Sequence, residues 1–170
     1  MDMQRIRITA GSIFRVELGV KTGFFQYIGS DNTQLDSNVI KVFRSRYGVA
    51  EQPKLPEVAA DAVGFYAHCL LGTGYKLGYW TKAGHAAVQA AAPPLFRDTY
   101  DYGRAAWQEP VLISYKWVVW RMNKEMHRVG KLTHEMQMAE IGMVMSPSNI
   151  IHRMQHGTYE LPFYPAFEAS

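Results

Sequence analysis

Three consecutive β-strands are predicted between residues 11 and 47, and they constrain the fold more than any other part of the chain. In the first strand Phe14 and Val16 point to one side. Arg15 and Glu17 point to the other, so one face is apolar and the opposite face is mostly in contact with water. Such a segment is the start of a small sheet or barrel. It presents a surface and carries no recognisable reaction chemistry.

The composition is that of a folded, sheet-rich protein. Hydrophobic residues make up 48% of the 170 positions and charged residues 19%, which excludes a disordered chain. An aromatic content of 13% favours strands, because aromatic side chains fit a pleated, half-buried surface. We predict one α+β, predominantly β domain spanning residues 1–170. It contains a single antiparallel sheet, open or barrel-like, with a C-terminal helix packed on it.

The net charge of +3 permits an acidic partner without indicating one. The basic residues are scattered, and the densest group is Lys41, Arg44 and Arg46. A solvated surface explains this group better than a phosphate-binding patch, because nucleic-acid binders usually carry clustered basic stripes. Nucleic-acid binding through Arg44 and Arg46 is therefore the third functional hypothesis, and it predicts an affinity that falls steeply with salt.

A single cysteine, Cys69, excludes an internal disulfide. Its apolar neighbours predict a buried structural thiol rather than a reactive one. Residues 1–5 lack the apolar core of a signal peptide, and no stretch of about 18 apolar residues is present. We therefore expect a cytoplasmic protein without a membrane segment.

Five segments complete the predicted organisation. Residues 63–71 form a continuous apolar run that predicts a buried central strand. Residues 72–80 are glycine-rich and aromatic, which favours a loop, and the alanine-rich segment 83–92 is either a short helix or an exposed linker. Residues 111–120 predict a strand covered on both faces. Residues 146–157 predict a helix that begins at a serine cap and ends at a glycine.

The histidines give only a weak indication of metal binding. His152 and His156 are spaced by four on the predicted last helix, as in zinc-binding pairs. No adjacent glutamate, third ligand or cysteine pair accompanies them, and the dipole at the C-terminal end of the helix accounts for His156 without a metal. We expect neither a metal nor another cofactor.

The most polar aromatic segment surrounds two aspartates, Asp98 and Asp101, with Arg97, Tyr100 and Tyr102. Three interpretations fit this composition. The two carboxylates can form an acid–base pair, the segment can form the polar rim of an interface, or the loop can satisfy its own polar groups. The third interpretation has the most support, because aspartates in turns usually bond the local backbone.

Several short motifs together resemble the mostly-β immunity proteins of bacterial polymorphic toxin systems. The opening strand Gly-Ser-Ile-Phe-Arg-Val is of the kind described for that family. The matching motifs lie at residues 24–35, 39–47, 96–103, 117–123 and 128–132. The resemblance implies a non-enzymatic cytoplasmic protein that binds a cognate toxin and blocks it. It transfers no functional residue to this chain, and the segment 83–92 has no place in the pattern.

We therefore predict stoichiometric inhibition of a protein partner through two loops rich in tyrosine, tryptophan and arginine, the residues that commonly anchor interfaces. The predicted contact residues are Tyr75, Tyr79, Trp80, Arg97, Asp98, Tyr100, Asp101 and Tyr102. The alternative is a small enzyme that uses Asp98, Asp101 and a tyrosine together with a histidine. A pocket that joins one of these aspartates to a histidine would indicate it.

Overall fold

The computed structural model describes residues 6–103 and 107–169. The strands are β1 (Ser12–Glu17), β2 (Lys21–Asp31), β3 (Ser37–Phe43), β4 (Tyr47–Gly48), β5 (Val63–Cys69), β6 (Thr81–His85), β7 (Leu95–Thr99), β8 (Trp117–Arg121), β9 (His127–Gly130), β10 (Glu140–Ile141) and β11 (Val144–Met145). The helices are α1 (Leu55–Ala59), α2 (Leu71–Lys76), α3 (His134–Gln137) and α4 (Pro147–His156).

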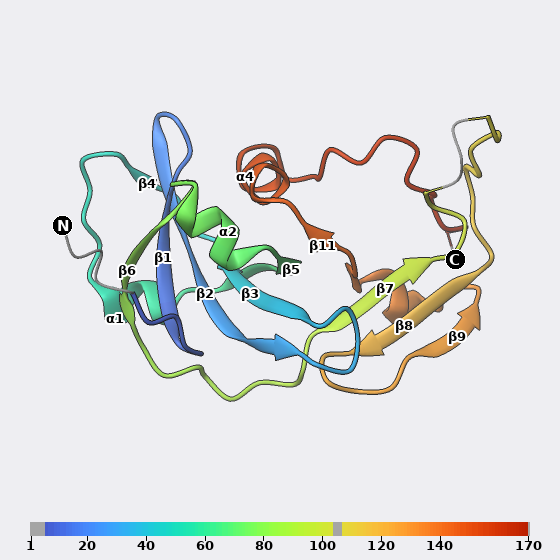
Figure 1. Cartoon of the computed structure of the whole chain (residues 1–170), viewed down its shortest axis with the longest axis horizontal. Coiled ribbons are helices and arrows are strands. Elements are labelled where there is room, and N and C mark those ends of the chain that lie inside the picture. Colours follow the sequence, from blue (N-terminus) through green and yellow to red (C-terminus); the bar gives the residue numbers. More distant parts are fainter. Residues whose placement is uncertain (1–5, 104–106, 170) are drawn as a thin grey trace.

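In the described part of the chain, the strands form two sheets that lie next to each other along the long axis of the molecule (Figure 1). The seven-stranded sheet has the order β11-β5-β3-β2-β1-β6, with β4 paired to β2. The four-stranded sheet has the order β10-β7-β8-β9. The predicted mostly β, α+β class is confirmed. The prediction of one antiparallel, barrel-like sheet is wrong, because there are two sheets, each mixed and neither closed.

One short segment makes both sheets mixed. β10 pairs in parallel with β7, and β11, only three residues further on, pairs in parallel with β5. The chain therefore crosses from the four-stranded to the seven-stranded sheet within residues 140–145. Gly142 lies at the crossing, where a β-carbon would overlap the indole of Trp120. Close approach of the backbone thus requires glycine at this position.

The three opening strands form the predicted antiparallel meander, β1 to β2 to β3. Gly19 begins the turn between β1 and β2 with φ of 87°, as a tight hairpin turn with glycine at its first central position requires. Leu18 N donates to Lys21 O at 2.8 Å and closes this turn. These local signals explain why the meander is predictable from the sequence.

The main core lies on one face of the seven-stranded sheet, beneath α2 and α4. Phe25, Ile40 and Phe65 contribute to it from the sheet, and Ile150 and Met154 contribute from α4. The predicted caps of α4 are confirmed. Ser146 Oγ accepts from Asn149 N, and Gly157 ends the helix in the left-handed conformation. Cys69 is buried in the same core, as expected, and burial raises the pKa of its thiol.

The opposite face of the same sheet is less exposed to water than the sequence predicts. Ile13, on the face expected to be mostly wet, is fully buried with Phe24 and Phe43. Val58 of α1 covers this second cluster. Both faces of the sheet are packed. Buried and exposed side chains therefore alternate only at the outer end of β1, where Glu17 is exposed.

The predicted strand over residues 111–120 is shorter than expected. Only β8, starting at Trp117, belongs to a sheet, and both of its faces are buried as predicted. Residues 111–116 form a loop that contacts the C-terminal segment through one bridge between Ile113 and Ala166. The alanine-rich segment also differs in part, because residues 81–85 form β6 against β1 and residues 86–94 follow without a helix.

The glycine-rich segment 72–80 is not the predicted loop, because its first half forms helix α2. Gly74 lies against the indole of Trp80, which is buried and donates from Nε1 to Leu71 O at 3.1 Å. Gly72 has open space where a side chain would begin. The two glycines of α2 therefore have different roles, and only Gly74 permits tight packing.

This difference gives a test of the packing around Trp80. Gly74→Ala should lower the free energy of unfolding by about 2–3 kcal/mol, because the new methyl group overlaps the buried indole of Trp80. Gly72→Ala should be neutral or stabilise by up to about 1 kcal/mol, because alanine favours helix. Urea unfolding followed by tryptophan fluorescence measures both. Equal effects of the two substitutions would contradict this account.

Candidate functional site

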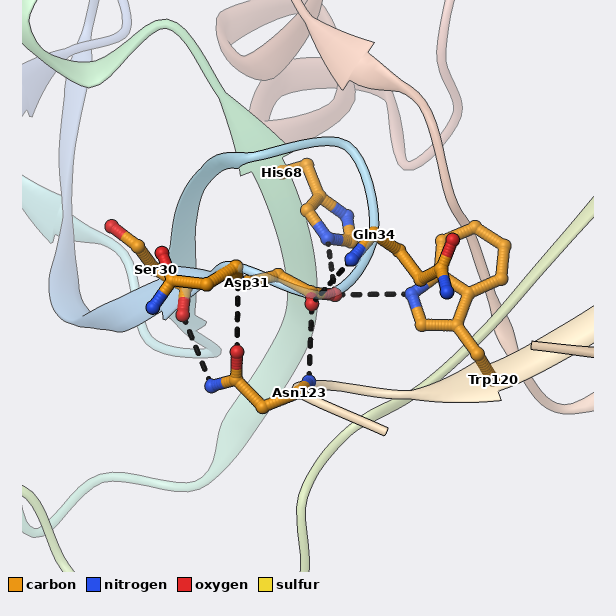
Figure 2. Close-up of polar contacts among 7 residues, drawn as sticks. Ser30, Asp31, Gln34, His68, Trp120 and Asn123 are labelled. Carbon is orange, nitrogen blue, oxygen red and sulfur yellow. Dashed lines mark hydrogen bonds and ion pairs between the residues drawn. The ribbon is translucent and has the colours of Figure 1, made fainter. Parts of the chain in front are cut away.

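The carboxylate of Asp31 lies at the junction of the two sheets and is completely buried. Figure 2 shows the side chains that converge on it. Oδ2 accepts hydrogen bonds from His68 Nε2 at 3.1 Å and from Trp120 Nε1 at 3.0 Å. Oδ1 accepts from the backbone N–H groups of Gln34 and Asn123, both at 3.1 Å. Four donors thus satisfy the carboxylate.

Asn123, after the end of β8, extends this contact between the sheets. Its side-chain Oδ1 accepts from Asn32 N at 2.8 Å, and its Nδ2 donates to Ser30 O at 3.0 Å (Figure 2). The turn after β8 is therefore joined to the end of β2 and the loop after it by three hydrogen bonds when the bond from Asn123 N to Asp31 is included. This arrangement fixes the position of the four-stranded sheet against the seven-stranded one.

The ionisation of this pair follows from burial and hydrogen bonding. Burial raises the pKa of Asp31, but the hydrogen bonds from His68, the two backbone N–H groups and Trp120 outweigh it, so the net shift is downward. Burial lowers the pKa of His68 more than the nearby carboxylate raises it. Asp31 is therefore ionised and His68 neutral near pH 7. The proton of His68 lies on Nε2, because that atom donates to Asp31.

In many enzymes a carboxylate–histidine pair activates a nucleophile, but this pair is closed to solvent. Both side chains are fully buried, and the ring of His68 packs on Phe96 with centroids 4.2 Å apart. Nδ1 of His68 is buried without a hydrogen-bond partner among the described residues. The arrangement holds the two sheets together. A substrate would need the sheets to separate before it could reach the imidazole.

Asp31 lies at the start of a turn, and the bond from Gln34 N is the local backbone bond that turn aspartates usually make. The longer-range partners were missed. His68 is 37 positions away along the chain and Trp120 is 89 positions away. Only the pairing of the strands brings them together, so no local signal could have identified them.

Most of the predicted polar loop satisfies its own polar groups. Ser114 Oγ donates to Asp101 Oδ2 at 2.8 Å, and Asp101 N donates to Thr99 Oγ1 at 3.1 Å. Lys116 Nζ lies 3.6 Å from the other oxygen of Asp101. Trp117 Nε1 donates to Ser114 O at 2.8 Å. Ser114 therefore ties the segment after β7 to the start of β8, so Asp101 is satisfied within the fold by residues that lie outside the predicted segment.

Arg97 and Asp98 are also held by neighbouring groups. The guanidinium of Arg97 stacks between the rings of Trp117 and Phe167, 5.1 Å from each centroid. Tyr164 donates to Asp98 Oδ1 at 3.1 Å. Burial raises the pKa of Asp98, and the hydrogen bonds from the Thr99 backbone and from Tyr164 oppose the shift. The structure thus gives Asp98 a tyrosine partner, whereas the enzymatic alternative requires a histidine.

The β7–β8 loop, defined as residues 100–116 without 104–106, carries a group of exposed apolar side chains, of which only Tyr100 was among the predicted contact residues. The indole of Trp107 is 83% exposed and Leu112 is 70% exposed. Tyr100, Ile113 and Tyr115 are exposed as well. The loop lies at one end of the four-stranded sheet, beside the C-terminal segment (Figure 1). Leu112, Ile113 and Tyr115 were missed because the apolar run 111–115 is typical of a buried strand.

The second predicted contact region, residues 75–80, is only partly accessible. Trp80 is 2% exposed and belongs to the core, so it offers no side-chain surface to a partner. Tyr75 packs against the same core, and its ring lies 6.4 Å from that of Phe14. Tyr79 is exposed. The segment therefore contributes one accessible aromatic side chain where three were expected.

The remaining chemical hypotheses concern histidines and arginines. The rings of His152 and His156 are 4.6 Å apart, and within the described residues no group of three or more candidate ligands gathers around a common point. Arg46 donates from Nη1 to Phe43 O at 2.7 Å and to other backbone carbonyls, which occupies its guanidinium in the fold. Lys41 is buried, so the basic group of residues 41–46 does not form a single surface.

Comparisons with known proteins give no assignment. No family model, no curated protein and no solved structure matches the chain. Among the described residues, none of the helices has the length and hydrophobicity required to cross a bilayer. The site chemistry must therefore be argued from the geometry of this chain itself.

The Asp31 network predicts a large effect from a small substitution. Asp31→Asn should lower the free energy of unfolding by about 2–4 kcal/mol, because the amide nitrogen then faces two hydrogen-bond donors and leaves them unpaired. The matched control is Asp36→Asn, at an exposed position of the same loop where φ is 41° and asparagine is well tolerated. Chemical denaturation compares the two variants, and similar losses would refute the network account.

The pKa shifts also predict that acid weakens the fold in two steps. His68 has a pKa below its unfolded value, so the unfolded chain binds a proton first and stability falls as pH drops below about 6.5. Asp31 also has a lowered pKa, so its contribution is present above the unfolded value and is lost as pH falls through the folded one. Urea midpoints measured between pH 8 and about pH 3 test both steps.

The first step is assigned by substitution. His68→Gln should flatten the dependence of the urea midpoint on pH near and below about 6.5, whatever its effect on absolute stability. His127→Gln, at an exposed position on β9, should leave the dependence as in the wild-type protein. An unchanged dependence in His68→Gln would show that another group carries the first step.

Proposed function

We propose that this protein is a non-enzymatic, immunity-type protein that binds a cognate toxin protein in the cytoplasm and neutralises it stoichiometrically. The family resemblance supplies the class of partner. The observation that carries the proposal is the exposed β7–β8 loop, with Trp107 83% exposed at its surface. Tryptophan and tyrosine are the residues that most often carry binding energy at protein interfaces.

The construction of the loop supports a binding role. Its apolar side chains point outward, while its base is held by the hydrogen bonds of Ser114 to Asp101 and to Trp117. The backbone of the loop also pairs with the C-terminal segment, where Ser114 N donates to Ala166 O at 2.9 Å. A loop that is ordered before binding loses less conformational entropy when a partner docks.

Arg128 adds a basic group beside the loop. Its guanidinium lies over the ring of Tyr100, 5.4 Å from the centroid. An aromatic ring with an arginine on it offers both apolar area and hydrogen-bond donors to a protein partner. We therefore place the contact surface on Tyr100, Trp107, Leu112 and Tyr115. Asp101 holds the base of this loop through its hydrogen bond from Ser114.

The proposal is tested by protection and by binding. Co-expression of the protein with its candidate toxin should restore the growth of a bacterial host, and Trp107→Ala should weaken the purified complex by about 10- to 100-fold, as expected for a hot-spot residue. Leu77→Ala is the matched control, because Leu77 is an exposed side chain at the far end of α2. Affinity is measured by calorimetry with purified partners.

The possible outcomes separate the two functional hypotheses. A stoichiometric complex weakened by Trp107→Ala and unaffected by Leu77→Ala supports the proposal. A complex equally tight in both variants would place the interface elsewhere. Failure of the wild-type protein to bind or protect would contradict the inhibitor function. The enzymatic alternative then requires loss of a measured turnover in Asp98→Asn.

A further inference from the structure

A second feature of the molecule lies away from the β7–β8 loop. A cavity of about 440 Å³ is formed between the seven-stranded sheet and the chain segment 88–94. Ile28, Lys41 and Tyr66 form the wall on the sheet side, and residues 122–124 close one end. The volume is within the range of about 300–1,000 Å³ that is typical of small-molecule sites.

Lys41 is the unusual member of this wall. The residue is 6% exposed as a whole, but its ammonium is not enclosed by protein and forms no hydrogen bond or ion pair within the described residues. Nζ lies over the ring of Phe43, 5.3 Å from the centroid. Burial lowers the pKa of Lys41. A buried lysine without a counter-charge is costly, and such groups are normally paired.

The neighbours of Lys41 on the sheet do not neutralise it. Gln26 and Tyr66 lie directly opposite Lys41 on the two flanking strands. Both side chains are uncharged, so neither supplies a counter-charge, and no hydrogen bond joins either of them to Lys41 within the described residues.

The remaining charges of the cavity leave it positive. Lys124 is a second lysine in the lining, and Asp61 is its one carboxylate. Asp61 accepts from Ser45 N and from Ala62 N, both at 2.8 Å, so its oxygens already bind the local backbone. The side chains of Ile28 and Met122 contribute apolar surface. One buried cation beside apolar walls is complementary to a small anion with a short hydrocarbon part.

We propose that this cavity binds a small organic carboxylate, with its anionic group paired to the ammonium of Lys41 and its hydrocarbon part against Ile28 and Met122. A carboxylate fits better than a phosphate because one lysine balances a single negative charge. The proposal does not depend on toxin binding, since the cavity and the β7–β8 loop share no residue.

The first test uses butanoate as the probe, with inorganic phosphate and chloride at equal ionic strength as comparisons. Butanoate should shift the NMR signal of the Met122 methyl group in a saturable way, at a concentration of about 10 mM for a dissociation constant of about 1 mM. Lys41→Met should weaken this binding at least about tenfold, because it removes the charged partner and keeps the shape. Lys124→Met should weaken it much less.

Several results would overturn the assignment. Butanoate binding that is equal in wild type and Lys41→Met would exclude Lys41 as the anion partner. Saturable binding of phosphate without binding of butanoate would contradict the carboxylate class. Shifts that rise without saturation, or that chloride reproduces, would show non-specific salt effects only.

A stability measurement gives an independent check that needs no ligand. Lys41→Met should raise the midpoint temperature of unfolding in ligand-free buffer, because burial disfavours the charged form of Lys41 and methionine preserves the volume of the side chain. Butanoate should raise the midpoint of the wild-type protein and leave that of Lys41→Met unchanged. A lower midpoint for Lys41→Met would show that the fold itself satisfies the ammonium, which would overturn the proposal.

Discussion

The ionised carboxylate of Asp31 determines how the two sheets are joined. Its four hydrogen-bond donors come from the loop after β2, from β5, from β8 and from the turn after β8. Burial of a charge is unfavourable unless every lone pair is satisfied, so the sheets must meet in the one arrangement that brings all four donors together. Apolar packing alone is less selective, because hydrophobic contact has no preferred direction.

The apolar contacts around this carboxylate bury surface between the two sheets but do not fix the relative orientation of the sheets. Val39 from β3 packs with Phe96 from β7 and Trp120 from β8. Trp120 takes part in both kinds of contact, because its indole N–H bonds Asp31 while its ring lies in this cluster. A single side chain therefore couples the polar and apolar parts of the junction.

Those parts of the fold that are encoded locally could be predicted from the sequence. The β1–β3 meander has alternation and turn residues, and α4 has a serine at its start and a glycine at its end. The parallel pairings that make both sheets mixed could not be predicted in this way. They depend on β10 and β11, which have two residues each and therefore show no periodicity.

The proposed contact surface on the β7–β8 loop lies next to the predicted polar segment in the sequence, but it consists mostly of other residues. Asp101 binds Ser114 of the exposed loop, whereas Asp98 binds Tyr164 of the C-terminal segment. Leu112 and Tyr115 were expected inside a strand, since an apolar run looks the same whether a sheet or a partner covers it. Lys41 was assigned to the surface because its burial depends on the distant segment 88–94.

The crossing at residues 140–145 has a consequence for the order of folding. β5 and β7 can each acquire a parallel neighbour only after this segment exists, and it lies in the last fifth of the chain. During synthesis, the meander and the β7–β8 pair can form as they leave the ribosome, but the bridging strands and α4 come last. Contacts of such long sequence separation form slowly. A ribosome that stalls before this point would therefore leave two incomplete sheets with open edges, which are templates for aggregation.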